Sequence, residues 1–93
     1  MSENISLELA SSVDISVVEK LFESMNSISP AGDVVNIGAN KVERLDTAAT
    51  QLLYVYQQYM DKKHVSVVYV SPSEKFMEII TLLGMQQLIH VKH

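Results

Sequence analysis

The hydrophobic residues of this chain change repeatedly between the spacing of a β-strand and the spacing of an α-helix. Residues 5–9 (Ile-Ser-Leu-Glu-Leu) alternate apolar and polar side chains, which predicts a strand with one buried face. After Asp14 the apolar residues recur every three or four positions, which predicts a helix. Asp14 is the expected N-cap, and Ser16 with Glu19 has capping-box spacing as an alternative start. Residues 29–33, which contain a proline and a glycine, should end the helix.

The second half of the chain continues the alternation. Residues 33–37 predict a short strand, and residues 38–40 interrupt it. Residues 42–45 then lead into a second helix that opens at Asp46 and Thr47 and runs to about residue 61. Residues 65–70 have five apolar positions in six, which is typical of a strand buried on most of its surface.

A third helix and a final strand complete the chain. Ser71 is the expected N-cap of this helix, with Pro72 at the first helical position and Glu74 at the third. Gly84 should end the helix. Residues 88–91 (Leu-Ile-His-Val) predict the last strand.

Seven elements in the order β-α-β-α-β-α-β follow from these patterns. Strands and helices that alternate through short loops favour right-handed crossovers and a parallel sheet. We therefore predict an α/β fold with a small, mostly parallel (mixed) four-stranded sheet and three helices mainly on one face. The length of 93 residues suits a single domain, residues 1–93.

Composition narrows the function classes. Hydrophobic residues are 47% of the chain and charged residues 19%, as in a globular protein. The chain has no cysteine, which excludes a disulfide scaffold and a thiol nucleophile. The net charge is −4 and the seven lysines and arginines are scattered, so we expect no nucleic-acid partner. A polar, acidic start and the absence of a long apolar stretch lead us to expect a cytoplasmic location without membrane insertion.

Two strand-to-helix turns are candidate binding sites. In parallel sheets such turns gather at the carboxyl ends of the strands, beside the N-termini of helices. One turn contains Asp46, Thr47 and Ala48, and the other contains Ser71 and Ser73. Hydroxyls and free N–H groups at a helix start suit an anion, a phosphate or the carboxylate of a partner, although the same residues also serve as ordinary caps.

Patterns for catalysis and for metal binding are missing from the sequence. It contains neither a Gly-x-Ser-x-Gly elbow nor a glycine-rich phosphate loop. Its histidines have no ligand spacing with a carboxylate: His64, His90 and His93. The sequence therefore indicates a binding module, and we expect neither enzymatic activity, nor a metal, nor a cofactor. Three tyrosines on the second helix, Tyr54, Tyr56 and Tyr59, fit either core packing or an aromatic contact patch.

The chain resembles the STAS domain family, which includes bacterial anti-sigma-factor antagonists and the cytoplasmic domains of sulfate transporters. The resemblance is closest at residues 42–53 (Val-Glu-Arg-Leu-Asp-Thr-Ala-Ala-Thr-Gln-Leu-Leu) and at residues 82–85 (Leu-Leu-Gly-Met), and more loosely covers residues 5–91. It implies a non-enzymatic protein-interaction module. The contact residues that it implies are Asp46, Thr47, Ala48, Thr50, Ser71 and Ser73.

The turn at the second helix departs from the pattern of the antagonists. Their turn reads Asp-Ser-Ser-Gly, and a partner kinase phosphorylates the second serine, which is Ala48 here. The resemblance thus implies that the usual phosphoacceptor is absent, and Thr47 is the hydroxyl that remains. The sequence Asp46-Thr47-Ala48 is closer to the Asp-Thr-Ala-Gly form found in the small STAS subunit of the bacterial phospholipid-transport ABC system and in STAS proteins linked to chemotaxis clusters. Ala49 replaces the usual glycine.

A second departure lies at the N-terminus. STAS domains usually begin with a two-stranded hairpin, whereas only about 13 residues precede the first predicted helix here. We expect this region to provide one strand, which leaves an edge of the sheet exposed. Our hypothesis is that a partner or a second copy of the chain, as in a homodimer, covers that edge.

Three functions follow from the resemblance, of which the first two are protein-interaction roles and the third belongs to a different class. The first is an interaction module in a bacterial signalling or regulatory complex, with an anti-sigma, kinase-like or chemotaxis protein as its partner. The second is the STAS subunit of a phospholipid-transport ABC system, bound to the ATPase of that system. The third is a sensor that binds a nucleotide, which the missing phosphate loop and the acidic composition disfavour.

Overall fold

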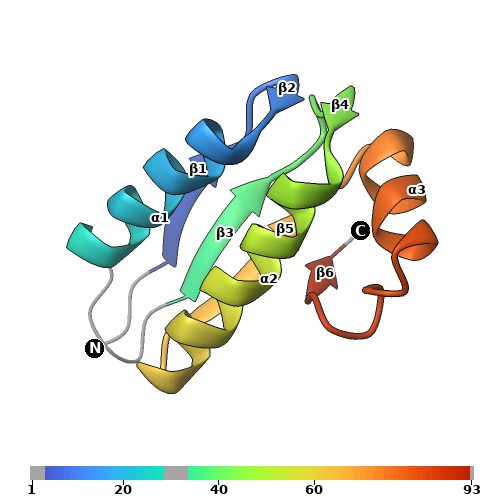
Figure 1. Ribbon diagram of the computed structural model, residues 1–93. Coiled ribbons are helices and arrows are strands. Elements are labelled where there is room, and N and C mark those ends of the chain that lie inside the picture. The colour runs from blue at the N-terminus through green and yellow to red at the C-terminus, as the bar shows by residue number, and fades with distance from the viewer. Residues whose placement is uncertain (1–3, 29–33, 93) are drawn as a thin grey trace.

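Four parallel strands form the main sheet in the computed structural model, which describes residues 4–28 and 34–92. In their order across the sheet they are β1 (Asn4–Glu8), β3 (Val34–Gly38), β5 (Ser66–Val70) and β6 (Val91–Lys92). Two further strands, β2 (Ser12–Val13) and β4 (Arg44–Leu45), form a separate parallel pair. Figure 1 shows this pair beyond the carboxyl ends of β1 and β3.

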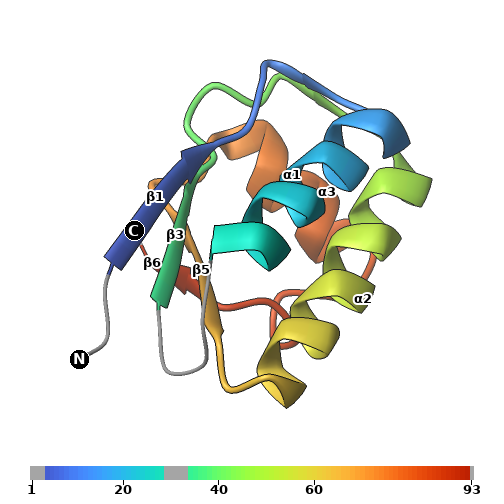
Figure 2. The same cartoon turned by 90° about the vertical axis from the view of Figure 1, so that its left-hand side faces the viewer.

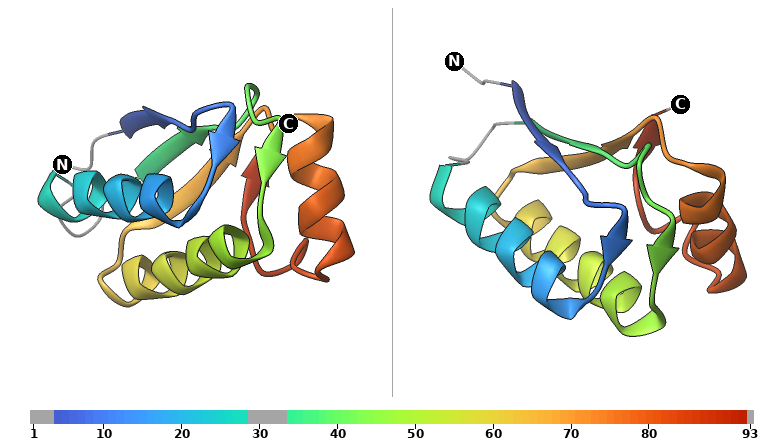
Figure 3. Two further views of the ribbon diagram at one scale, coloured as in Figure 1. Left: turned by 45° about the horizontal axis from the view of Figure 1, so that its top comes forward. Right: turned by 90° about the horizontal axis from the view of Figure 1, so that it is seen from above.

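All three helices lie on one side of the main sheet. They are α1 (Ile15–Ile28), α2 (Thr47–Lys62) and α3 (Glu74–Leu82). Figure 2 shows them together on the same face, and the two views in Figure 3 agree. The α/β fold with a mostly parallel four-stranded sheet and helices on one face is therefore confirmed. Residues 29–33, where we expected the first helix to end, lie outside the described residues.

The core is the layer between the helices and the sheet. Alternate residues of the strands point into it, and the largest contribution from the sheet is the fully buried Tyr69. Apolar side chains of the three helices pack into this layer, although Ile15 remains 42% exposed. The fully buried residues include Val35, Ile37 and Val67 from the strands and Val18, Met60, Phe76 and Ile80 from the helices. Burial of this apolar surface is the main stabilising contribution, because about 25 cal/mol is gained per Å² removed from water.

The final strand is shorter than the sequence predicts. Only Val91 and Lys92 pair with β5, whereas the expected strand began at Leu88. The chain before β6 instead forms a turn in which the Leu88 N–H donates to the Met85 carbonyl at 2.9 Å. The amide of Gln57 on α2 holds this turn by donating to the Leu88 carbonyl at 2.7 Å. A long-range contact with α2 thus outweighs the β-propensity of residues 88–90.

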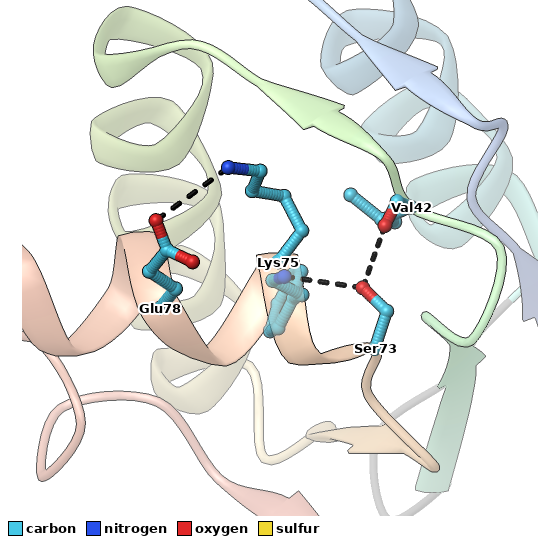
Figure 4. Close-up of polar contacts among 5 residues, drawn as sticks. Val42, Ser73, Lys75 and Glu78 are labelled. Carbon is cyan, nitrogen blue, oxygen red and sulfur yellow. Dashed lines mark hydrogen bonds and ion pairs between the residues drawn. The ribbon is translucent and has the colours of Figure 1, made fainter.

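The third helix begins two residues later than the sequence predicts. Ser71 is not its N-cap, because its backbone has φ of 49° and its N–H donates to the Lys92 carbonyl at 2.8 Å, beside β6. Ser73 caps the helix instead, and its Oγ accepts a hydrogen bond from the Phe76 N–H at 3.1 Å. The same hydroxyl donates to the Val42 carbonyl at 2.6 Å (Figure 4). The pairing of Ser71 with the sheet therefore moves the start of α3 along the chain.

Asp14 caps α1 as predicted. Its Oδ1 accepts hydrogen bonds from the Ser16 hydroxyl at 2.7 Å and from the Val17 N–H at 3.0 Å. These two bonds hold the pKa of Asp14 below its ordinary value of 3.8. A carboxylate with a lowered pKa stabilises the folded state at pH values above its pKa in the unfolded chain. That contribution disappears as the pH falls through the lowered value.

We expect Asp14→Asn to remove this dependence on pH, because asparagine caps a helix without titrating. The urea midpoint of the wild type should fall relative to that of Asp14→Asn when the pH is lowered from neutral to about 3. Unfolding followed by circular dichroism at both pH values measures the difference. A difference that stays constant with pH would show that the cap of α1 does not contribute to acid sensitivity.

We expect Ser73→Ala to lower the free energy of unfolding by about 1–2 kcal/mol, because the N-cap bond and the bond to the Val42 carbonyl are both lost. Ser71→Ala is the matched control, and it should change the free energy by less than about 0.5 kcal/mol. Urea titrations of the two variants provide the comparison. A larger effect at Ser71 would place the cap where the sequence alone predicts it.

Candidate functional site

The turn that opens α2 is organised by Asp46. This residue has the extended backbone of an N-cap, with φ of −80° and ψ of 163°, and its Oδ1 accepts from the Ala49 N–H at 2.7 Å. Its carbonyl accepts from both the N–H and the hydroxyl of Thr50, at 3.0 Å and 2.9 Å. The predicted role of Asp46 as the cap that defines the turn is confirmed.

Thr50 is not a contact residue, which corrects the prediction from the sequence. Its side chain is fully buried, and its hydroxyl is used within the turn by the bond to the Asp46 carbonyl. Because the side chain is buried, a partner cannot reach it. Thr50 instead helps to keep the first turn of α2 rigid.

Thr47 and Ala48 form the accessible part of the turn. Both are exposed, and the Thr47 hydroxyl has no hydrogen-bond partner within the described residues. They occupy the first two positions of the helix, where backbone N–H groups have no partner inside the helix. The turn therefore presents the hydroxyl of Thr47, the methyl groups of Thr47 and Ala48, and unpaired N–H donors on a rigid support.

The second predicted turn lies at the same end of the molecule, but its two serines differ. Ser73 is only half-buried, but its hydroxyl is used within the protein. It donates a hydrogen bond to the Val42 carbonyl and accepts one from the Phe76 N–H. It is a structural residue and not a contact residue. Ser71 is exposed and remains available to a partner.

A short segment between β3 and α2 holds the helix N-termini together. The Ser11 carbonyl accepts from the N–H groups of Glu43 and Arg44 at 2.8 Å and 2.9 Å, which joins the starts of α1 and α2. On the other side the Ser73 N–H donates to the Ala39 carbonyl at 3.0 Å, which joins the start of α3. Figure 1 shows the starts of these helices at the carboxyl end of the sheet, so the two predicted turns do share one end of the fold.

An apolar strip on α2 continues from the turn, and the sequence analysis did not identify it. Its large exposed members are Val55 and Tyr59, which are 52% and 45% exposed. Together with Ala48 and the half-buried Leu52 they follow the spacing i, i+4, i+7 and i+11, which places them on one side of the helix. That spacing was the signal in the sequence, but only the structure shows that Ala48, Val55 and Tyr59 are exposed, while Leu52 also packs against the core. We call the residues Ala48, Leu52, Val55 and Tyr59 the α2 strip.

The tyrosines of α2 combine the two roles that the sequence left open. Tyr56 stacks on Phe22 of α1 with ring centroids 4.1 Å apart, and Tyr59 meets the edge of the same ring at 5.2 Å. The Lys63 ammonium lies 4.6 Å from the centroid of Tyr59. Tyr56 therefore packs α1 against α2, whereas Tyr59 packs and also remains accessible. Tyr54 accepts a hydrogen bond from the Gln58 amide at 2.7 Å on the surface.

The described residues provide no cluster that could hold a metal ion. No group of three or more His, Asp or Glu side chains comes together within residues 4–28 and 34–92. His64 and His90 are both exposed, and His93 lies outside the described residues. The strongest perturbation of an ionisable group is at Tyr69, where burial raises the pKa of the phenol and keeps it neutral. That residue belongs to the core and not to the turn.

Comparison with known proteins agrees with the fold. In the part of the chain that the structure describes, no helix is long and apolar enough to cross a membrane. No curated protein matches the chain. A family model described as "Mlab, STAS domain" matches residues 2–90. Because this match spans nearly all of the 93 residues, the chain belongs to the STAS domain family.

Proposed function

We propose that this protein is a non-enzymatic interaction module that binds its protein partner through the start of α2. STAS domains generally mediate protein–protein interactions. The observation that carries the proposal is the exposure of Thr47 and Ala48 on a turn that Asp46 and Thr50 hold rigid. A preorganised surface of this kind loses little conformational entropy on binding.

The α2 strip extends this contact surface. An interface of stable size needs about 800 Å² from each partner, which is far more than one helical turn supplies. The strip adds apolar area that begins at Ala48 and runs to Tyr59, and apolar and aromatic side chains of this kind are typical of the buried centre of interfaces. A charged side chain lies at its far end, since the Lys63 ammonium is 4.6 Å from the centroid of the Tyr59 ring.

Binding in this proposal does not depend on the phosphorylation that switches the anti-sigma-factor antagonists. The position of their phosphoacceptor is Ala48, whose side chain has no oxygen. A phosphate would also add nearly two negative charges to a contact that is packed and partly apolar. The module is therefore constitutively competent for its partner.

The most general setting that we propose for this interaction module is a regulatory complex of the bacterial cytoplasm. A more specific alternative is a STAS subunit bound to the ATPase of a phospholipid-transport ABC system. Two observations favour this alternative: the Asp46-Thr47-Ala48 turn and the description of the matching family model. Co-purification with an ATPase subunit would support the alternative, and co-purification with a kinase or an anti-sigma protein would support the signalling context.

We expect Thr47→Glu to abolish capture of the partner, because it places a charge in the centre of the contact. Thr81→Glu is the matched control, since Thr81 is an exposed threonine in the last turns of α3, away from the start of α2. Immobilised wild type and both variants are incubated with extract of the native cell, and the captured proteins are identified by mass spectrometry. A protein captured equally by all three would remove the α2 turn from the interface.

We expect incubation with a partner kinase and ATP to leave the protein without a phosphate. Intact-mass spectrometry measures the stoichiometry, and a variant with the usual acceptor, Ala48→Ser, is the positive control. Stoichiometric phosphate on Thr47 of the wild type would contradict constitutive binding.

A nucleotide sensor is the competing function at the same turn, because unpaired N–H groups at a helix start can bind phosphate. Isothermal titration calorimetry with ATP and GTP separates the two functions. We expect no saturable heat, and saturable binding in the micromolar range that Thr47→Glu removes would replace the interaction module with a nucleotide site.

A further inference from the structure

Strand β1 lies at an edge of the sheet and is paired on one side only. It is hydrogen-bonded to β3 along residues 4–8, and no described strand pairs with its other side. Figure 2 shows β1 at the rim of the sheet, with β3 beside it. An uncovered edge presents unpaired N–H and C=O groups, which are a template for another strand.

The parallel ladder decides which groups face outward. The Leu9 N–H donates to the Gly38 carbonyl at 2.9 Å, so the odd-numbered residues turn their backbone groups towards β3. Successive residues of a strand turn these groups to opposite sides. The N–H and C=O groups of Asn4, Ser6 and Glu8 therefore point to the free edge.

We propose that a second copy of this chain covers the edge by pairing its own β1 antiparallel to the first, with the two-fold axis at Ser6. In this register Ser6 lies opposite Ser6 of the second copy, and Asn4 lies opposite Glu8 of the second copy. Each of these pairs consists of outward-facing residues, so each can exchange both hydrogen bonds of an antiparallel pair. The two sheets then become one continuous sheet.

The length of the paired segment and charge together select this register. An axis at Ser6 pairs all three outward-facing residues of β1 with those of the second copy, whereas an axis at residue 5 or 7 pairs only two of them. An axis at Glu8 would place two carboxylates directly opposite each other, and like charges in that arrangement are destabilising. With the axis at Ser6, Glu8 faces a neutral asparagine and keeps its ion pair with Lys41, which is 3.4 Å long. An axis at Asn4 would leave the outward N–H and C=O groups of Glu8 without a partner residue in the second copy.

A hollow beside the free edge supplies apolar area for the same contact. It has a volume of about 260 Å³, lies between β1 and α1, and is lined mainly by apolar side chains that include Leu7, Val17 and Leu21. Leu7 is half-buried and packs against the core. The proposed register puts residue 5 of the second copy, an isoleucine, opposite Leu7. Apolar positions thus meet on the helix side of the joined sheet, and polar positions meet on the open side.

The antiparallel arrangement has a consequence for the site at α2. The carboxyl ends of the two sheets point in opposite directions, so the two copies of the α2 turn lie at opposite ends of the dimer. Neither Thr47 nor the α2 strip takes part in the β1 contact. Self-association and partner binding are therefore independent, and Thr47→Glu should dimerise like the wild type.

Sedimentation velocity and light scattering over a concentration series into the millimolar range test the proposal. The expected result is a rise of the molar mass from 10.4 kDa to twice that value. A mass of one chain at every concentration overturns it.

Ser6→Pro should abolish the rise in molar mass, because proline removes an outward N–H and leaves the ladder with β3 intact. Ser6→Thr is the control that keeps the N–H and should dimerise. A dimer that persists in Ser6→Pro would lie on another surface and would overturn the proposal.

Two charged variants test the register itself and do not depend on the folding of the proline variant. Ser6→Lys and Ser6→Glu should each weaken self-association about fivefold or more, because two like charges then lie opposite each other at the axis. An equimolar mixture should associate more tightly than either variant alone, since Lys then faces Glu. A mixture that associates no better than the separate variants overturns the register centred on Ser6.

Discussion

The hydrogen bonds made by residues 39–46 are the constraint on which the rest of the structure depends. This segment leaves the carboxyl end of β3, pairs with residues 11–13 on one side and meets the cap of α3 on the other. It buries Val42 and Leu45, so it cannot move outward without exposing apolar surface. Because it bonds to the starts of all three helices, it fixes their N-termini at one end of a sheet that is covered on one face only.

The rigidity of the α2 turn follows from the same constraint. Asp46 donates its N–H to the Val13 carbonyl at 3.4 Å, and its other polar groups are used by Ala49 and Thr50. The N–H, the carbonyl and Oδ1 of Asp46 thus all bond within the protein and the side chain of Thr50 is buried, whereas the exposed side chains of Thr47 and Ala48 are left to face solvent. A division between supporting and accessible residues within one helical turn is what a rigid contact surface requires.

The two surfaces of interest differ in how they arise. The α2 turn and the α2 strip are side-chain surfaces, so their chemistry changes with single substitutions. The free edge of β1 is a backbone surface, and the pairing of β1 with β3 alone determines which groups it presents. A protein with both can bind a partner and a second copy of itself without competition between the contacts.

The sequence by itself determined the order of the three helices and the four strands of the main sheet, the parallel sheet with helices on one face, and the caps at Asp14 and Asp46, because these follow from the local spacing of apolar residues and from short-range capping bonds. It also indicated the α2 turn as the candidate site. It did not predict the short pair β2 and β4. Only the tertiary structure decided that Thr50 and Ser73 face inward, that α3 starts after Ser73, and that the last strand is reduced to Val91 and Lys92. Each of these outcomes depends on a partner distant in sequence, such as the Val42 carbonyl for Ser73 or the Gln57 amide for the turn before β6. Contacts of that kind have no periodic signal along the chain, so they appear only when the folded elements meet.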